Sequence, residues 1–418
     1  MSQFEIKALS EAKQESLLKA YSTVRNQTEL ICEVLSIEDQ IVQPSSEVSP
    51  PKWHLGHTTW FFEEMLLAKF IPDYQRFDTD FPIIFNSYYK AAGENWIQAN
   101  RGQLSRPTVD EVINYRHSID EQVIKLISSN HPESKEISRI IELGLHHEQQ
   151  HQELLYMDIK YILGMNPSWP AYSSQKLPPA TKPSSDWYSL AEGLFEIGHI
   201  GKGFSYDNER PKHKSYVYAC SIRQSMVSNG EYLDFIENGG YEQATLWLSK
   251  GFDFIQSAEI QSPKYWIKKD DQWFEYTLHG LVPLNPDMPI CHISYFEANA
   301  FANWKACRLP TEQEYELFLG NFQQTNKQKN THVFHPTNAN DLTGLWCWTS
   351  SHYSAYPGYQ SFDGALQEYN SKFMCNQFVL RGGCVASPAG HVRHTYRNFY
   401  EPHQRWMFSG IRLAKDES

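Results

Sequence analysis

The chain has 418 residues, with 41% hydrophobic and 21% charged side chains and a formal net charge of −12, a composition typical of a globular protein with two or three domains. The negative charge argues against a general nucleic-acid-binding or anionic-membrane-binding surface, and no apolar run approaches the length of a transmembrane helix. There is no basic-then-apolar signal pattern at the N-terminus, and seven scattered cysteines favour a reducing compartment. We therefore expect a cytoplasmic protein.

The first part of the chain has helical periodicity. Apolar residues predict helices over about 7–36, from about 52 onwards, over about 108–129 and over about 134–163. A Pro/Ser stretch at 44–51 separates the first two. Helices of this length and number favour a four-helix bundle, a fold that builds metal sites from side chains on facing helices. We expect the bundle to span residues 1–165.

The last of these helices contains His147 and His151. Side chains four residues apart lie on one helix face, and two imidazoles so placed hold a metal in His-Glu-x-x-His zinc helices. A third ligand must come from another helix. By spacing, His57 and His54 are equal candidates, whereas His146 points about 100° away from His147. The alternative interpretation is a helix whose histidines lie at the surface or make ordinary hydrogen bonds.

A long aromatic connection follows the second predicted helix and contains Tyr88, Tyr89, Arg101 and Arg106. Long connections in compact domains are often functional. A tyrosine beside a metal can supply a proton, and an arginine can bind a carboxylate through two parallel hydrogen bonds. Taken alone, these residues favour a simpler interpretation, in which a tyrosine packs and the arginines make surface ion pairs.

The second half of the chain has a different pattern. Residues 166–186 are rich in Pro and Ser and predict a linker. Beyond it, short apolar runs divided by Gly, Pro and Asn, with helical patches at about 228–238 and 294–306, predict an α+β domain over 187–418 whose pockets are built by loops. Thr311, followed three residues later by Glu314, has the pattern of a helix N-cap.

Several motifs, taken in their order along the chain, resemble those of known protein families. The second half resembles the formylglycine-generating-enzyme-like (sulfatase-modifying factor) family, a C-type-lectin-like α+β domain, at residues 227–232, 289–295, 308–312, 344–351, 380–383 and 408–412. The first half resembles a DinB-like four-helix bundle through His-Leu-Gly-His, which ends at His57, and through His-Glu-Gln-Gln-His-Gln-Glu at 147–153. In this order, the fusion resembles the sulfoxide synthases of ergothioneine biosynthesis (hercynine oxygenases) from about residue 50 to 414.

The resemblance implies a cofactor and substrates. In that family three histidines bind iron(II), Fe(2+), and by motif these are His57, His147 and His151. The family uses the iron, O2 and a thiol to attach sulfur to imidazole C2 of hercynine, the trimethylated betaine of histidine, as a sulfoxide. The implied partners are therefore hercynine, O2 and either cysteine or γ-glutamylcysteine. The oligomeric state stays open.

The reaction needs a proton donor, which the family often places in the C-terminal domain. One branch resembles this chain in carrying a tandem tyrosine pair in the N-terminal domain, and Tyr88 and Tyr89 match that pair. We expect the donor to be one of these two tyrosines. Tyr353, Tyr356 and Tyr359 are the competitors.

The resemblance also implies a substrate pocket. An Asn-Trp-Asp-like family segment lines the hercynine site, and a glutamine between two ligands contacts substrate. The residues of this chain at those positions are Asn398, Phe399, Tyr400 and Gln150. Tyr400 lacks the acid that helps related enzymes to hold the thiol, which favours cysteine over γ-glutamylcysteine. The carboxylate-binding candidates are Arg101 and Arg397, and Arg106, Arg381, Arg393 and Arg405 remain open as alternatives.

Three alternatives remain. One is an ovothiol-type synthase, which joins cysteine to imidazole C5 of histidine and usually carries a methyltransferase domain. The second is a selenoneine synthase, which uses a selenosugar. The third is not an enzyme but a metal-binding module fused to a lectin-like binding domain.

Overall fold

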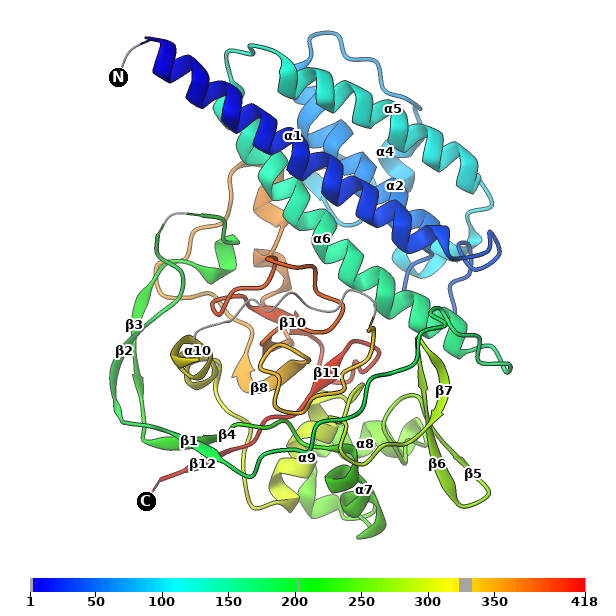
Figure 1. Cartoon of the computed structure of the whole chain (residues 1–418), viewed down its shortest axis with the longest axis vertical. Helices are drawn as coiled ribbons and strands as arrows, with labels where there is room; N and C mark the ends of the chain where they lie inside the picture. The colour runs from blue at the N-terminus through cyan, green and yellow to red at the C-terminus, as the bar shows by residue number, and fades with distance from the viewer. Residues whose placement is uncertain (1–2, 202, 323–332, 418) are drawn as a thin grey trace. The chain divides into compact units, whose positions relative to one another are not determined.

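The computed structural model describes residues 3–201, 203–322 and 333–417. The chain forms two compact units (Figure 1). Unit 1 comprises Met1–Met165 together with Asp363–Glu368, and unit 2 comprises Asn166–Phe362 and Tyr369–Ser418. The short segment from the second half that joins unit 1 was not predicted from the sequence. It includes Glu368, whose carboxylate accepts hydrogen bonds from the backbone N–H groups of Lys90 and Ala91.

Unit 1 is a four-helix bundle among its described residues. Its long helices are α1 (Gln3–Glu33), α2 (Pro51–Phe62), α5 (Val109–Ser128) and α6 (Ser134–Gly164). Helix α1 packs on α6, and α2 packs on both α5 and α6 (Figure 1). Short helices complete the unit: α3 (Ala68–Phe70), α4 (Phe81–Ile84), η2 (Lys90–Ala92), η3 (Gln98–Gln103) and η6 (Gly364–Glu368). The bundle predicted from periodicity is confirmed.

Glycines allow two close approaches to α2, one by α6 at Gly144 and one by Phe85 at Gly56. A Cβ on Gly144 would lie 2.7 Å from the Phe62 ring, and a Cβ on Gly56 would lie 2.1 Å from the Phe85 ring. Real Cβ atoms do not approach other atoms so closely, so larger residues at either position would push the elements apart. Gly144 therefore allows the close approach of the two helices that carry the histidines, and Gly56 allows the Phe85 segment to lie against α2.

The inner face of α1 is more polar than its periodicity predicts. Leu30, an apolar residue of this helix, is 55% exposed, whereas Arg25 and Thr28 are buried. Both buried side chains bind the carboxylate of Glu148 on α6. Apolar spacing does not detect a buried helix face made of paired polar groups.

A π-helical turn, η1 (Glu63–Leu67), continues α2. Its first residue, Glu63, is fully buried, and its carboxylate accepts hydrogen bonds from Tyr115 on α5 at 2.5 Å and from the backbone N–H of Phe77 at 2.8 Å. This carboxylate holds the end of α2 against α5 and the following loop. Such turns frequently occur at functional sites, and the sequence did not predict this one.

Unit 2 is an α+β fold, as predicted. Its described strands form a four-stranded sheet in the order β10-β9-β8-β11, three-stranded sheets in the orders β1-β4-β12 and β5-β6-β7, and the hairpin β2-β3 (Figure 1). The strands are β1 (Trp187–Leu190), β2 (Gly193–Ile197), β3 (His213–Val217), β4 (Cys220–Arg223), β5 (Trp266–Lys269), β6 (Gln272–Thr277), β7 (Gly280–Pro283), β8 (Trp346–His352), β9 (Phe378–Arg381), β10 (Asn398–Tyr400), β11 (Ser409–Gly410) and β12 (Ala414–Asp416).

The helices of unit 2 are α7 (Asn229–Glu237), α8 (Ser249–Ser257), α9 (Tyr295–Trp304) and α10 (Glu312–Asn321), with short η4 (Asp207–Glu209), η5 (Ala244–Leu246) and η7 (Ser371–Phe373). Helices α7, α9 and α10 begin at side-chain caps, whereas α8 does not. The predicted N-cap of α10 is confirmed: Thr311 Oγ1 accepts from the Glu314 backbone N–H, and Glu314 Oε2 accepts from the Thr311 N–H. Helices α7 and α9 have the same reciprocal pair.

The Pro/Ser-rich segment 166–186 is an ordered strap on unit 2. The backbone N–H groups of Tyr172 and Ser173 both donate to Leu278 O at 2.9 Å, and the Ser184 N–H donates to Asn340 Oδ1 at 2.8 Å. These bonds satisfy backbone groups that a proline-rich segment cannot pair in a sheet or helix of its own.

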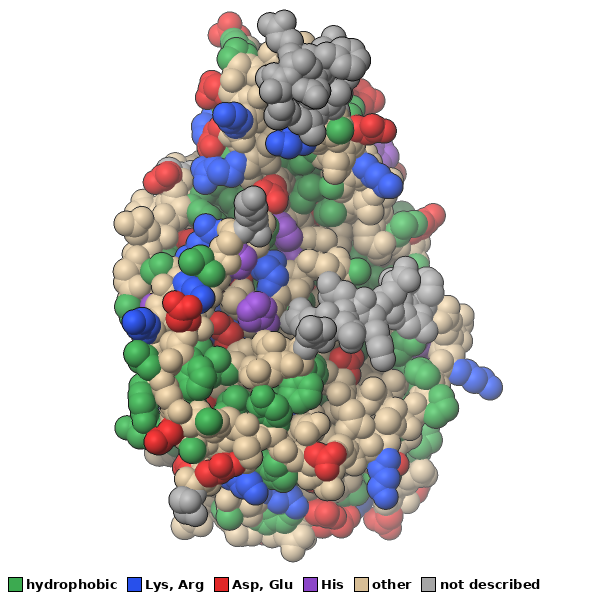
Figure 2. Space-filling model, turned by 60° about the vertical axis from the view of Figure 1, so that its left-hand side comes forward, with side chains coloured by type: hydrophobic (Ala, Val, Ile, Leu, Met, Phe, Trp, Pro, Cys, Tyr) green, Lys and Arg blue, Asp and Glu red, His purple; other side chains and the backbone are tan. Residues whose placement is uncertain are grey.

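Charged side chains of both signs are interspersed on the face shown in Figure 2. Single-sign patches are the usual footprint of a protein that binds nucleic acid or anionic lipid, and the described residues of this face do not form a large one. Among the described helices, none is long and apolar enough to cross a membrane.

Candidate metal centre

Three histidines of unit 1 form a compact cluster. His57 comes from α2, and His147 and His151 come from α6. One ring nitrogen from each lies within 4.8 Å of the others. His57 and His147 are buried and His151 is half-buried. The i, i+4 pair thus meets a third imidazole from a facing helix, a set of groups that could hold a metal ion.

The orientation of His57 is fixed from two sides. Its Nδ1 lies 2.6 Å from Phe85 O, and because a carbonyl only accepts, Nδ1 carries the proton and the Nε2 lone pair stays available. The ring also stacks between two indoles, with centroid distances of 4.6 Å to Trp53 and 5.5 Å to Trp60. Gly56 allows Phe85 to come this close.

His54, which by spacing is the alternative third ligand, has different hydrogen-bond partners from His57. Its Nδ1 lies 2.8 Å from His151 Nδ1, and its Nε2 lies 2.9 Å from Asp158 Oδ2 on α6. Both ring nitrogens therefore face protein groups, and His54 is not part of the cluster of candidate ligand atoms. The choice of His57 over His54, which spacing left open, rests on this difference.

The cluster favours neutral imidazoles. Burial lowers the pKa of His147 to about 3. Burial, together with the neighbouring His147, lowers the pKa of His57 and of His151 well below the ordinary value. Neutral imidazole is the form that binds metal ions. At neutral pH the three rings are thus ready to coordinate without losing protons.

The predicted tyrosine pair lies on the segment that holds His57. Tyr89 is fully buried, its ring stacks on Tyr88 at 4.6 Å, and it packs on Trp60 at 5.6 Å. The Asn86 side chain fixes the turn, accepting from the Tyr89 N–H at 3.1 Å and donating to Tyr89 O at 3.0 Å. The rings of Trp60 and Tyr89 therefore link the tyrosine pair to His57.

Arg101 lies in the same region and is only 6% exposed. Its guanidinium stands 3.3 Å from the centre of the Trp53 ring and donates to Ser49 Oγ at 2.8 Å. No described carboxylate forms an ion pair with it, and its Nε has no hydrogen-bond partner. Burial lowers its pKa to about 9, so it stays charged at neutral pH. The simpler interpretation, a surface ion pair, is wrong for Arg101.

The remaining substrate-binding candidates lie in both units. Gln150 is half-buried on α6. Asn398, Phe399 and Tyr400 form β10, the edge strand of the four-stranded sheet of unit 2. Phe399 stacks on Tyr353 at 4.0 Å, and Asn398 Oδ1 accepts from the Phe399 N–H at 2.9 Å. All three residues of β10 are half-buried.

Arg397 is committed to the interior of unit 2. Its Nε and Nη2 bind the two oxygens of Glu312 at 2.8 and 2.9 Å, and further bonds reach Asn208 O and Ser354 O. A guanidinium engaged in this way is poorly placed to bind a substrate carboxylate. This structural ion pair removes the basis for a substrate-binding role of Arg397.

The competing tyrosines of unit 2 also have partners within that unit. Tyr353 OH accepts from Asn208 Nδ2 at 2.9 Å, and Tyr359 OH donates to Asp207 Oδ2 at 2.7 Å. Tyr356 OH donates to Glu312 Oε2 at 3.1 Å. These hydroxyl groups support the fold of unit 2.

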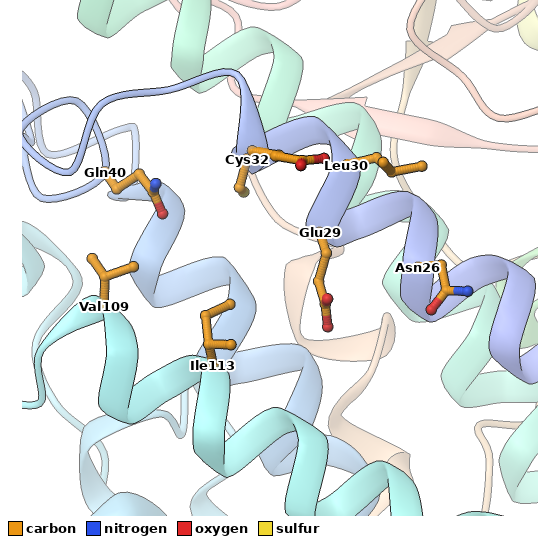
Figure 3. Close-up of a pocket in the computed structure, with 8 residues that line it drawn as sticks. Asn26, Glu29, Leu30, Cys32, Gln40, Val109 and Ile113 are labelled. Carbon is orange, nitrogen blue, oxygen red and sulfur yellow. The ribbon is translucent and has the colours of Figure 1, made fainter.

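Unit 1 also has a surface pocket between α1 and α5 (Figure 3). It is lined by Asn26, Glu29, Leu30, Cys32, Glu33, Gln40, Val109 and Ile113. None of these is a residue of the histidine cluster or of the predicted substrate site. The pocket therefore adds nothing to the candidate metal centre.

The sequence contained signals for residues that the prediction missed. Asp158 follows His151 by seven residues, which is two helical turns and the same face of α6. Trp53 precedes the His-Leu-Gly-His motif and Trp60 follows His57 by three residues, so both lie beside His57 on the helix. Helical spacing would have identified all three as neighbours of the ligands.

Comparison with known proteins separates the chain into the same two parts. Residues 20–155 match the family model described as the DinB superfamily. Residues 173–320 match the model described as the sulfatase-modifying factor enzyme 1-like domain. The predicted fold pair is confirmed by both matches.

Several relatives carry names that bear on function. The chain is 32% identical to the hercynine oxygenase of Mycobacterium tuberculosis over 242 residues, covering 51% of this chain and 56% of that protein. It is 29% identical to the hercynine oxygenase of Mycolicibacterium smegmatis over 314 residues, covering 66% and 71%. It is 28% identical to ergothioneine biosynthesis protein 1 of Schizosaccharomyces pombe over 232 residues, covering 51% of this chain and 28% of that protein.

The fold and the histidine cluster define a DinB-like bundle, with groups able to hold a metal ion, joined to a sulfatase-modifying-factor-like domain. Within that class, this chain is a relative of the hercynine oxygenases, and its resemblance to the sulfoxide synthases of ergothioneine biosynthesis is confirmed. Its match spans little more than half of the Mycobacterium tuberculosis protein.

Proposed function

We propose that the chain is an iron(II)- and O2-dependent sulfoxide synthase that joins a cysteine thiol to imidazole C2 of hercynine. The single observation that carries the proposal is the meeting of His57, His147 and His151 in a chain related to hercynine oxygenases. A surface helix with scattered histidines would not bring three imidazoles from two helices to one point.

The donor set fits iron. Imidazole nitrogens bind iron(II) well, and a set of three protein ligands leaves coordination positions for substrates. Bound at these rings, iron would activate O2 and the thiol for carbon–sulfur bond formation. The chain holds the rings ready for this, because the Phe85 carbonyl and the Trp53 and Trp60 indoles fix the orientation of His57.

Arg101 is the proposed anchor for a substrate carboxylate. A buried guanidinium without an ion-pair partner is costly, and a bound carboxylate offsets that cost through charge-assisted hydrogen bonds. Because Arg101 stacks on Trp53, and Trp53 stacks on His57, the anchor stands close to the metal ligands. Both amino-acid substrates carry a carboxylate, and an arginine so placed would orient one of them.

Tyr88 and Tyr89 are the proposed proton donors. A tyrosine hydroxyl is protonated at neutral pH and can deliver a proton as sulfur is oxidised and bonded to carbon. Their segment, Phe85–Tyr89, also orients His57, so the position of the hydroxyl groups and that of the ligand depend on the same turn. Gln150, Asn398, Phe399 and Tyr400 keep their substrate-binding roles as predictions from the resemblance.

Purified iron-loaded protein, supplied with hercynine, O2 and either cysteine or γ-glutamylcysteine, tests the proposal. We expect O2 consumption and a product with the mass of the hercynyl sulfoxide, with cysteine preferred because Tyr400 lacks a carboxylate. Parallel reactions with unmethylated histidine and with a selenosugar test the ovothiol-type and selenoneine alternatives. If no thiol supports O2 consumption with hercynine, the proposed activity is wrong.

A further inference from the structure

Two buried side chains outside the ligand cluster connect it to the interior of unit 1. His54 on α2 is 2% exposed and Asp158 on α6 is 3% exposed. His54 Nε2 lies 2.9 Å from Asp158 Oδ2, and His54 Nδ1 lies 2.8 Å from His151 Nδ1. The imidazole of His54 therefore bridges a carboxylate and a candidate metal ligand.

The carboxylate end of this bridge is itself held in place. The same oxygen, Asp158 Oδ2, accepts from the Ser49 backbone N–H at 2.9 Å, just before the start of α2. Asp158 stands two turns after His151 on the same face of α6. The carboxylate is thus held in a fixed position relative to His151, and the His54 imidazole lies between the two side chains.

The bridge permits one arrangement of protons that suits metal binding. A carboxylate accepts, so His54 Nε2 carries the proton that it donates to Asp158, and neutral His54 presents a lone pair at Nδ1. That lone pair accepts from a protonated His151 Nδ1, which leaves the His151 Nε2 lone pair available. The opposite tautomer would place a proton on His151 Nε2 and block coordination there.

We propose that Asp158 and His54 form a hydrogen-bonded relay that fixes the tautomer and ring orientation of His151 and strengthens this imidazole as a metal ligand. Both are positioning residues, because they act through His151. The inference rests on the metal centre of the proposed function and adds to it the group that tunes one of its ligands. Partners of this kind typically contribute about 10- to 100-fold in metal affinity.

The test is a Co(II) titration of the full chain, followed by the visible absorption of the bound ion. His54→Phe keeps an aromatic ring but removes both nitrogens, and Asp158→Asn keeps the shape of the side chain but removes its charge. We expect His54→Phe to weaken Co(II) binding about 10- to 100-fold and to alter the absorption bands. His54→Gln, whose amide offers one donor and one acceptor, should bind more tightly than His54→Phe.

A double-mutant cycle separates a relay from two unrelated effects. If Asp158 acts through His54, the double variant His54→Phe/Asp158→Asn should bind Co(II) no more weakly than His54→Phe alone, since the carboxylate no longer reaches His151 through the imidazole of His54. Additive losses in the double variant, or wild-type affinity and spectrum in His54→Phe, would overturn the relay. His117→Gln, on the exposed side of α5, is the matched control and should bind like wild type.

Failure of the relay and failure of the metal centre give different results. If the wild-type chain binds no Co(II), or if His147→Ala binds it as well as wild type does, the metal centre itself is wrong. Circular dichroism and urea unfolding of the metal-free variants identify a fold defect. If His54→Phe is unstable, Asp158→Asn alone still tests the carboxylate end of the relay: it should weaken Co(II) binding, and wild-type affinity and spectrum would overturn the relay.

Discussion

Arg25 Nη1 and Glu148 Oε2 form an ion pair at 2.9 Å inside unit 1, and both side chains are shielded from water. Glu148 also binds Arg116 and accepts from Thr28 Oγ1 at 2.6 Å. Burial by itself raises the pKa of Glu148, but the guanidinium groups of Arg116 and Arg25 outweigh it and lower the pKa to about 2. This network joins α1 and α5 to the helix that carries His147.

Removing the charge of Glu148 should therefore destabilise the bundle. Glu148→Gln removes the fully buried carboxylate that Arg25 and Arg116 share and leaves them paired with the more exposed Asp120 and Glu29. The loss of one partner of a buried pair costs about 3–5 kcal/mol. Urea unfolding of the metal-free chain, followed by far-UV circular dichroism, measures it. Glu136→Gln breaks a surface pair with Arg139 and should cost less than about 1 kcal/mol. Equal effects of the two substitutions would contradict the role of the network.

His147→Ala and His151→Ala should each abolish iron retention while the fold survives. Each removes one nitrogen from a three-imidazole set, and alanine is a good helix former, so α6 should persist. Metal content after gel filtration and the circular dichroism spectrum together measure this. His146→Ala, one residue along the same helix and outside the cluster, should retain iron. Unchanged iron content in both ligand variants would rule out the proposed set.

Tyr88→Phe and Tyr89→Phe should lower the sulfoxide yield and divert the thiol towards its sulfinate. Each removes a hydroxyl but keeps the ring that stacks in the Trp60–Tyr89–Tyr88 arrangement. Product ratios by mass spectrometry, at equal O2 consumption, show which hydroxyl matters. Tyr359→Phe, in unit 2, is the comparison and should keep the wild-type ratio. If both N-terminal variants also keep that ratio, neither tyrosine is the donor.

Arg101→Gln should raise KM for the substrate whose carboxylate it binds. Hydrogen bonds to charged groups contribute about 1.5–3 kcal/mol, and each 1.4 kcal/mol is about tenfold in affinity, so we expect KM to rise about 10- to 100-fold. Steady-state kinetics with each substrate varied in turn identifies the ligand. Arg106→Gln changes an exposed arginine of the same connection and should leave both KM values near wild type. Unaltered KM values in Arg101→Gln would refute the assignment.

The stability of unit 2 should fall on acidification because of Glu312. Burial alone raises the pKa of this carboxyl, but Arg397 and Arg381 more than offset it, and the pKa lies below the ordinary value of 4.5. A lowered folded-state pKa means that the unfolded chain takes up the proton first as pH falls. The stabilisation is thus complete above about pH 4.5 and is lost as pH falls through the folded-state pKa.

Urea unfolding at neutral pH and at about pH 3 measures this dependence. Glu312→Gln should be less stable than wild type at neutral pH and should lose less stability on acidification. The exposed Glu237→Gln should follow the wild-type curve. A Glu312→Gln variant with the full wild-type pH dependence would show that other carboxyl groups are responsible.

Local patterns predicted much of the fold correctly. The segments of unit 1 with helical periodicity form α1, α2, α5 and α6, and the ends of these helices lie close to the predicted positions. The Thr311 cap and the helices α7 and α9 appeared where capping and apolar spacing placed them. These features depend on neighbours within a few residues, which a sequence displays directly. The π-helical turn η1 did not follow from them, because it depends on Tyr115 and Phe77 binding Glu63.

The candidate site also has features that the sequence predicted and features that only the structure shows. Helical spacing paired His147 with His151, but it could not choose between His57 and His54, which lie three residues apart. The choice depends on the positions of Phe85 O and Asp158. Phe85 O is hydrogen-bonded to a ring nitrogen of His57, and Asp158 is hydrogen-bonded to a ring nitrogen of His54. Arg397 and Arg101 likewise look alike in sequence. Only their surroundings show that Glu312 neutralises the first, whereas the second is buried without an ion-pair partner among the described residues.

By itself the sequence determined the two-part organisation, the helical i, i+4 histidine pair and, through ordered motifs, the resemblance to sulfoxide synthases. Periodicity, capping and motif order are properties of the chain read along its length. The tertiary structure decided which imidazole completes the cluster, that His54 and Asp158 stand behind His151, and that a polar network fills the bundle interior. Those features depend on distances between side chains that are far apart in the sequence. Gly144 allows α6 to pack closely on α2, and Gly56 allows Phe85 to do so.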